Sequence, residues 1–229
     1  MASIDPPAAP AEPMPPTDAA EILVIVAHPE LEQSRANRRL LQAVRALQKV
    51  APASRLAVRD LYALYPDYLI DVGVEQAALA AARLVVWQQP IRWYSMPPLL
   101  KLWLDDVLTF GWAYGPDGGV LRGKDLWLVA STGGPEDSYR PDSYNRYFFD
   151  AFLPPYEQTA ALCGMRFLPP LILHGAHKAS EAELGAHADT YVRRLADYPA
   201  WPEIDEVEEC VECAVPPSAR PADRVMEAA

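Results

Sequence analysis

The sequence predicts an α/β fold in which a five-stranded parallel sheet is covered by helices on both faces. Two observations lead to this prediction. Short apolar runs alternate with longer amphipathic segments along the middle of the chain, and this alternation is typical of parallel sheets with crossover helices. The apolar runs also contain few polar residues, as expected for strands that are buried on both faces.

Five segments have the length and composition of such strands. The first reads ILVIVA and the fourth reads KDLWLVAS, so both are almost wholly apolar. In chain order, the predicted strands are 22–27, 54–60, 83–89, 124–131 and 167–175.

Five helices are predicted between and after these strands. Positions 35–50 place leucine and valine side chains on one face at helical spacing. Pro97 and Pro98 begin another helix, since proline is tolerated in a first helical turn. Ser180 and Glu183 form a capping box at the start of the last helix. The remaining ranges are 73–82, 153–164 and, for the capped helix, 180–198.

Elements in this order fit a flavodoxin-like sheet. In such sheets, ligands bind at the carboxyl ends of the strands, near the point where the strand order reverses. The loops that follow the first, third and fourth strands are therefore the places to search for a functional site.

The composition limits the class of protein. The 229 residues suit one domain, predicted at 22–198, between a proline- and alanine-rich leader at 1–21 and an acidic, proline-rich tail at 199–229. The net charge of −11 argues against nucleic acid as a partner and against electrostatic docking on anionic lipid. No stretch approaches the apolar length of a membrane helix, and the leader lacks the basic start and apolar centre of a signal peptide.

The cysteines indicate a reducing compartment. Three cysteines are too few for a disulfide framework, so a cytoplasmic location is expected. Two of them form the tail pair Cys210-x-x-Cys213, which supplies only half of a zinc site. A surface thiol pair is the favoured interpretation, and no metal site is predicted.

The first loop, AHPELEQSRAN, carries hydrogen-bond donors suited to a phosphate monoester. The helix that follows offers free backbone N–H groups and the positive end of its dipole. His28, Ser34 and Asn37 add a ring N–H, a hydroxyl and an amide. The loop has no glycine-rich fingerprint of a dinucleotide or P-loop site. The alternative is that Ser34 only caps the helix and that His28 is a turn residue.

The other two loops carry groups suited to a flat aromatic ligand. Trp93 and Tyr94 lie where the third strand ends, and they either pack against a ligand or fill the core. Gly133 and Gly134 follow the fourth strand and permit close approach of the backbone to a ligand, unless they form an ordinary turn. Three such loops at one end of a sheet indicate a ligand site less ambiguously than any one of them does.

These motifs together resemble a known family. AHP…S-x-A-N, WQ-x-P-x-x-WYS-x-PP-LLK-W-D, GWAYG and TGG occur in the order and spacing of the flavodoxin-like NAD(P)H:quinone oxidoreductases. Within that family the chain is most similar to the ancillary subunits of glutathione-regulated potassium-efflux systems. The resemblance covers about 22–198, and the middle motif is the most specific.

The resemblance implies a flavin site made by the three loops. The matching residues are His28, Ser34, Arg35, Ala36 and Asn37 for the flavin phosphate, Ile91, Arg92, Trp93 and Tyr94 for one side of the ring, and Ser131, Thr132, Gly133 and Gly134 for the other.

The resemblance also implies a reaction, namely two-electron hydride transfer from NAD(P)H through the flavin to a quinone. The short first loop favours FMN, although FAD is used in some branches. Tyr139 falls where some members have a tyrosine that assists the transfer, but the histidine that accompanies it has no counterpart in 141–145. Trp112 and Tyr114 of GWAYG are either pocket walls or core residues.

The same resemblance implies partners. A homodimer that completes the pocket is expected, and so is an association with a membrane potassium/proton antiporter. A regulatory subunit that binds and activates such an antiporter is therefore the alternative function. Its location is then cytoplasmic and peripheral, on the inner face of the cell membrane. One-electron transfer, as in true flavodoxins, is disfavoured because it needs no nicotinamide pocket.

Overall fold

The computed structural model describes residues 20–52, 55–116, 118–202 and 204, and it confirms the predicted fold. One five-stranded sheet has the order β2-β1-β3-β4-β5, and every pair of neighbouring strands is parallel. All five predicted strands are present, with ends that lie within two residues of the prediction. Their bounds are β1 Ile22–Val26, β2 Leu56–Asp60, β3 Leu84–Pro90, β4 Asp125–Ser131 and β5 Arg166–Leu173.

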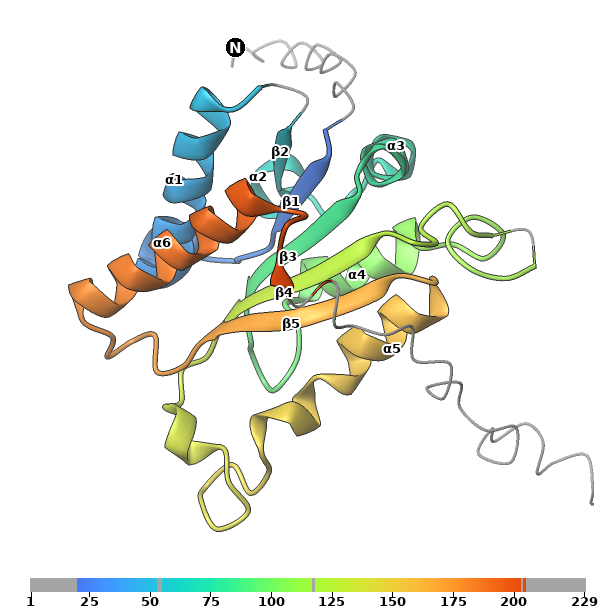
Figure 1. Ribbon diagram of the computed structural model, residues 1–229. Coiled ribbons are helices and arrows are strands. Elements are labelled where there is room, and N and C mark those ends of the chain that lie inside the picture. The colour runs from blue at the N-terminus through green and yellow to red at the C-terminus, as the bar shows by residue number, and fades with distance from the viewer. Residues whose placement is uncertain (1–19, 53–54, 117, 203, 205–229) are drawn as a thin grey trace, which may run out of the picture.

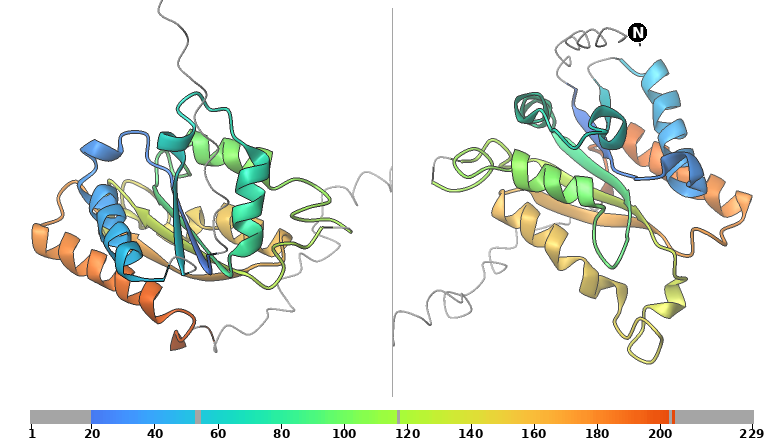
Figure 2. Two further views of the ribbon diagram at one scale, coloured as in Figure 1. Left: turned by 90° about the horizontal axis from the view of Figure 1, so that it is seen from above. Right: turned by 180° about the vertical axis from the view of Figure 1, so that it is seen from behind.

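Helices cover both faces of the sheet (Figures 1 and 2). α1 (Arg35–Val50) and α6 (Glu181–Asp197) pack on one face, and α3 (Val72–Ala81), α4 (Pro98–Val107) and α5 (Pro154–Leu162) pack on the other. These are the five predicted helices, and the capping box of Ser180 and Glu183 is present. The short helix α2 (Leu61–Leu64) and the 3-10 turns η1 (Leu31–Gln33), η2 (Glu136–Ser138) and η3 (Phe149–Phe152) were not predicted.

Alternating side chains of the strands supply two hydrophobic cores. Val24 and Val26 of β1 face the core under α1 and α6, whereas Leu23 and Ile25 face the core under α3, α4 and α5. Strands that are buried on both faces must be apolar throughout. This explains why the apolar runs alone located the strands.

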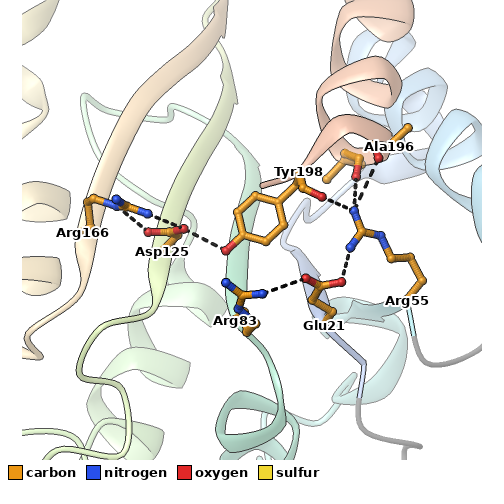
Figure 3. A network of polar contacts seen from close by, with 8 residues as sticks. Glu21, Arg55, Arg83, Asp125, Arg166, Ala196 and Tyr198 are labelled. Carbon is orange, nitrogen blue, oxygen red and sulfur yellow. Dashed lines mark hydrogen bonds and ion pairs between the residues drawn. The ribbon is translucent and has the colours of Figure 1, made fainter. Parts of the chain in front are cut away.

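A polar network closes the amino edge of the sheet (Figure 3). The Asp125 carboxylate accepts hydrogen bonds from the Arg166 guanidinium at 2.7 and 3.0 Å and from the Tyr198 hydroxyl at 2.8 Å. Arg55 donates to the Tyr198 carbonyl and to the Glu21 carboxylate. The network therefore holds the end of α6 against the starts of β1, β2, β4 and β5.

The packed part of the chain extends past the predicted boundary at 198. Trp201 is only 3% exposed, and its ring lies 4.8 Å from that of Trp127 in β4. The leader at 1–19, most of the tail and the Cys210 and Cys213 pair lie outside the described residues. In the described part of the chain, no helix is both long and apolar enough to cross a membrane.

Candidate functional site

A cleft of about 370 Å³ opens at the carboxyl edge of the sheet, where β1 and β3 lie side by side. The chain leaves β1 toward α1 on one face and leaves β3 toward α4 on the other, so this is the switch point of the sheet. The lining residues are His28, Glu30, Gln33, Ser34, Arg35, Ala36, Pro90, Ile91, Arg92, Ser131, Thr132, Gly133, Ala176 and His177.

His28 enters the cleft at the end of β1 as a neutral ring. Its Nδ1 accepts a hydrogen bond from the Glu30 backbone N–H at 3.1 Å. Burial, aided by the positive charge of Arg92, lowers the pKa of His28 to about 4. With Nδ1 acting as an acceptor, the ring proton of the neutral form resides on Nε2. His28 therefore presents one N–H donor and no charge at neutral pH.

The first turn of α1 carries an uncompensated positive dipole end. The Ser34 hydroxyl oxygen accepts the Asn37 N–H at 3.1 Å, so Ser34 is the N-cap, while the N–H groups of Arg35 and Ala36 have no intrahelical acceptor. No acidic side chain lies in this turn, although α6 has Glu181 and Glu183 in its own. Ser34 is thus a helix cap that also lines the cleft, and its contact with a phosphate stays a prediction. Such a turn favours an anion.

Asn37 lies beneath the cleft and does not line it. Its Nδ2 donates to the Ser131 hydroxyl oxygen at 2.8 Å, and its backbone carbonyl accepts from Gln88 at 3.0 Å. The side chain is only 1% exposed. In this structure the amide holds Ser131, which does line the cleft, and the expected contact between Asn37 and a phosphate stays a prediction.

The loop after β3 contributes Ile91 and Arg92 to the cleft, but not Trp93 or Tyr94. The backbones of Arg92 and Ser95 exchange hydrogen bonds at 3.0 and 3.1 Å around a two-residue turn. Its central residues, Trp93 and Tyr94, have φ values of 49° and 64°, the conformation of a type I′ turn.

This turn directs both aromatic side chains away from the cleft. Trp93 is 93% exposed, and Tyr94 stacks on Phe152 with ring centroids 5.0 Å apart. Trp93 therefore neither fills the core nor lines the cleft in this structure. The two residues form the turn that carries Arg92, and the contact of their rings with a ligand stays a prediction.

The loop after β4 lines the cleft with Ser131, Thr132 and Gly133. Gly134 does not line the cleft. A Cβ at that position would lie 2.7 Å from the Ser138 hydroxyl oxygen. Gly134 is thus required for packing within the loop, and only Gly133 supports the expected approach to a ligand.

Tyr139 is buried beside the cleft, and burial raises the pKa of its hydroxyl. His174, at the end of β5, lies with its ring centroid 5.4 Å from that of Tyr139 and its Nδ1 3.1 Å from Thr132 Oγ1. The Thr132 hydroxyl donates its hydrogen bond to the Gly134 carbonyl at 2.8 Å. His174 Nδ1 therefore carries a proton and donates to Thr132 Oγ1.

His174 is thus a histidine partner of Tyr139 that 141–145 does not provide. It was missed together with Ala176 and His177, which line the cleft, because the loop after β5 was not searched. The signal was available, since LILHGAH ends an apolar strand at the same edge. Glu30, Gln33 and Pro90 were the other lining residues not predicted.

Two further expectations can be placed. Trp112 and Tyr114 pack against the core under α4 and do not line the cleft. Within the described residues, no group of three or more histidine, cysteine, aspartate or glutamate side chains could hold a metal ion.

Comparison with known proteins identifies the family. A model of the flavodoxin-like fold matches residues 20–195. The chain belongs to this family. It is 46% identical over 184 residues to the glutathione-regulated potassium-efflux system ancillary protein KefF of Citrobacter koseri, covering 80% of this chain and 98% of that protein.

Solved structures of family members agree with the architecture. The general stress protein 14 of Treponema denticola, solved in complex with FMN, has a TM-score of 0.70 at 39% identity and covers 77% of this chain and 98% of that one. An NADPH-quinone reductase of P. pentosaceus has a TM-score of 0.65 at 26% identity, with coverages of 76% and 97%. These likenesses support a flavodoxin-like oxidoreductase.

Proposed function

We propose that the protein is an FMN-dependent NAD(P)H:quinone oxidoreductase. The observation that carries the proposal is the first turn of α1, whose free N–H groups open into a cleft at the β1/β3 switch point. A structural relative bound to FMN and another described as an NADPH-quinone reductase support the same conclusion.

The residues present fit FMN. The Arg35 and Ala36 N–H groups, the Ser34 hydroxyl and His28 Nε2–H would hold the phosphate, and no acidic side chain of the turn opposes it. Ile91, Thr132 and Gly133 would line the ring. The absence of a glycine-rich pyrophosphate loop favours FMN over FAD. When bound, the flavin supplies two-electron redox chemistry between a nicotinamide and a quinone.

The protein's own contribution is to position donors around the cleft. Asn37 holds the Ser131 hydroxyl oxygen by a hydrogen bond, and His174 holds that of Thr132. Donors held in place before the reaction stabilise developing charge without reorganising. Tyr139 lies buried beside this group of donors, and its predicted part in assisting hydride transfer is kept in the proposal.

Identification of the released flavin tests the cofactor. Heat-denatured protein is expected to release FMN in a ratio near one per chain, as measured by chromatography and absorbance. Release of FAD alone, or no flavin after reconstitution with FMN, would contradict the proposal.

Steady-state kinetics test the reaction. One cleft of this size cannot hold a flavin and two further substrates together, so NAD(P)H and quinone are expected to bind in turn. Double-reciprocal plots with varied quinone should give parallel lines. Intersecting lines would show simultaneous binding and would require a larger site than the cleft described.

A homodimer is part of the proposal. Trp93, Tyr147 and Phe148 are exposed hydrophobic side chains on the loops next to the cleft, where a second copy would cover them. Light scattering on the eluted peak should give twice the chain mass, and a monomer at micromolar concentration would contradict a stable dimer.

A second function is favoured by the identity to the KefF ancillary proteins. We propose that the chain also binds and activates a potassium-efflux antiporter on the cytoplasmic face of the membrane. Co-purification with a co-expressed potassium-efflux antiporter, and faster potassium efflux when both are present, are the expected results. Efflux that is independent of the chain would remove this function and leave the enzymatic one intact.

A further inference from the structure

Glu30 and Arg92 form an ion pair at the mouth of the cleft. The Arg92 guanidinium lies 2.8 Å from the Glu30 carboxylate, and both residues line the cleft. Glu30 follows β1 and Arg92 follows β3, so the pair joins the loops on the two sides of the switch point. Arg92 thus has a carboxylate partner in the absence of a ligand.

The backbones of the pair are fixed while the side chains are exposed. The Glu30 N–H donates to His28 at 3.1 Å, and Arg92 is held by its two bonds to Ser95. The side chains of Glu30 and Arg92 are 54% and 43% exposed. An ion pair this exposed contributes little net stability, because water competes for both charges. Replacing Glu30 by another anion as the partner of Arg92 therefore costs little free energy.

The charges of the cleft make this pair distinctive. Among the residues that line the cleft, Glu30 is the one carboxylate, and Arg35 and Arg92 are the two arginines. Arg35 is paired at 2.6 Å with Glu181, which does not line the cleft. The charge of Arg92 reaches the phosphate-binding wall, since it contributes to the lowered pKa of His28. A phosphate dianion in the cleft would be attracted by Arg92 and repelled by Glu30.

We propose that Glu30 and Arg92 are an exchangeable pair that sets the affinity of the cleft for the phosphate of its flavin. Glu30 occupies Arg92 in the free protein, and the phosphate takes the place of Glu30 on binding. Phosphate is the stronger partner, because it offers more charge and more acceptor oxygens to the guanidinium. Glu30 thereby weakens flavin binding and keeps the cofactor exchangeable. This inference rests on the proposed flavin function.

Equilibrium binding of FMN and riboflavin tests the pair, because riboflavin lacks the phosphate. Quenching of flavin fluorescence gives both dissociation constants in the reconstituted full-length protein. Glu30→Gln should tighten FMN binding about tenfold and Arg92→Gln should weaken it about tenfold, whereas riboflavin binding should change by less than about twofold. The double variant should bind FMN about as the wild type does.

Glu32→Gln is the matched control. It removes the same charge from the same loop, but Glu32 does not line the cleft and only approaches Arg38 at 4.0 Å. Glu32→Gln should leave the affinities for FMN and riboflavin unchanged. An effect equal to that of Glu30→Gln would show that only the net charge of the loop matters, and would overturn the inference.

Two other outcomes would also overturn the inference. Equal weakening of FMN and riboflavin by Arg92→Gln would mean that Arg92 contacts the ring. Unchanged FMN affinity in both variants would mean that the pair is only a surface contact. If the wild type binds neither flavin, the proposed function itself fails, and that result is distinguishable from the other two because it precedes any variant.

Discussion

At the amino edge of the sheet, each charged group of the network meets an opposite charge or a hydrogen-bond donor, whereas at the carboxyl edge several polar groups have none. Asp125 is bonded to both Arg166 and Tyr198 (Figure 3). In the described part of the carboxyl edge, Oδ1 of Asn37 and Oε1 of Gln88 are buried without a partner. The Arg35 and Ala36 N–H groups have no acceptor within their helix.

Backbone strain follows the same division. Trp93 and Tyr94 occupy left-handed conformations in the turn beside the cleft, and these conformations cost an L-residue roughly 1–2 kcal/mol each. The amino edge thus uses its polar groups to stabilise the fold, while the described part of the carboxyl edge keeps both donors and acceptors unpaired and a turn strained. Strain and unpaired groups persist where a function requires them, and ligand binding then supplies the missing partners.

The largest effect should come from the amino edge. Asp125→Ala removes the carboxylate that accepts hydrogen bonds from Arg166 and Tyr198, and loss of one member of a buried ion pair is strongly destabilising. Because Arg166 is about one-third exposed, we expect a loss of about 3 kcal/mol in the free energy of unfolding. Urea denaturation measures this loss, and the flavin affinity of the folded fraction should stay as in the wild type.

The matched control is Asp137→Ala, which breaks an exposed pair with Arg140. Its cost should be within about 0.5 kcal/mol. A folded Asp125→Ala protein that no longer binds flavin would show that the two edges are coupled and would break the comparison.

The next largest effect is a loss of stability at low pH, caused by His28 at the carboxyl edge. The unfolded chain protonates His28 near its ordinary pKa of 6.5, whereas the folded protein does so only at about 4. As the pH falls through this window, the unfolded state takes up the proton first, so the flavin-free protein loses stability. The loss is complete near pH 4 and amounts to about 2–3 kcal/mol.

His28→Asn isolates this contribution, because its side-chain oxygen can still accept the Glu30 N–H. The variant should lose less stability than the wild type between pH 7 and pH 4.5, as measured by urea denaturation of the flavin-free protein at each pH. An identical pH dependence in the two proteins would show that folding does not lower the pKa of His28.

The sequence predicted the fold better than the site, for a physical reason. Burial on both faces makes each strand apolar along its whole length, so local pattern locates it without knowledge of the neighbours. The helix α2 was missed because its four residues are too few to show a period. The boundary at 198 was early because burial of Trp201 depends on Trp127, a contact that no local pattern encodes.

In the site, the positions of groups that follow directly from the path of the local backbone were predictable. Backbone N–H groups and Ser34 must lie at the start of a helix that follows β1. The direction of the Asn37 amide depends on Ser131, and the environment of Tyr139 depends on His174; both contacts cross the sheet between distant segments. Trp93 was misplaced because only the positive φ of its turn directs the ring into solvent.

The smallest effect tests whether strain at the carboxyl edge serves the site. Trp93→Gly relieves the left-handed conformation at the cost of a more flexible unfolded chain, so the free energy of unfolding should rise by about 1 kcal/mol. The relaxed turn should also hold Arg92 less firmly, and NAD(P)H-dependent quinone reduction should fall several-fold. Arg146→Gly is the matched control, since Arg146 has a φ of 61° but lies outside the turn that carries Arg92. It should gain similar stability with unchanged activity, measured by urea denaturation and steady-state kinetics. Full activity in a stabilised Trp93→Gly protein would show that the strain serves no function at this edge.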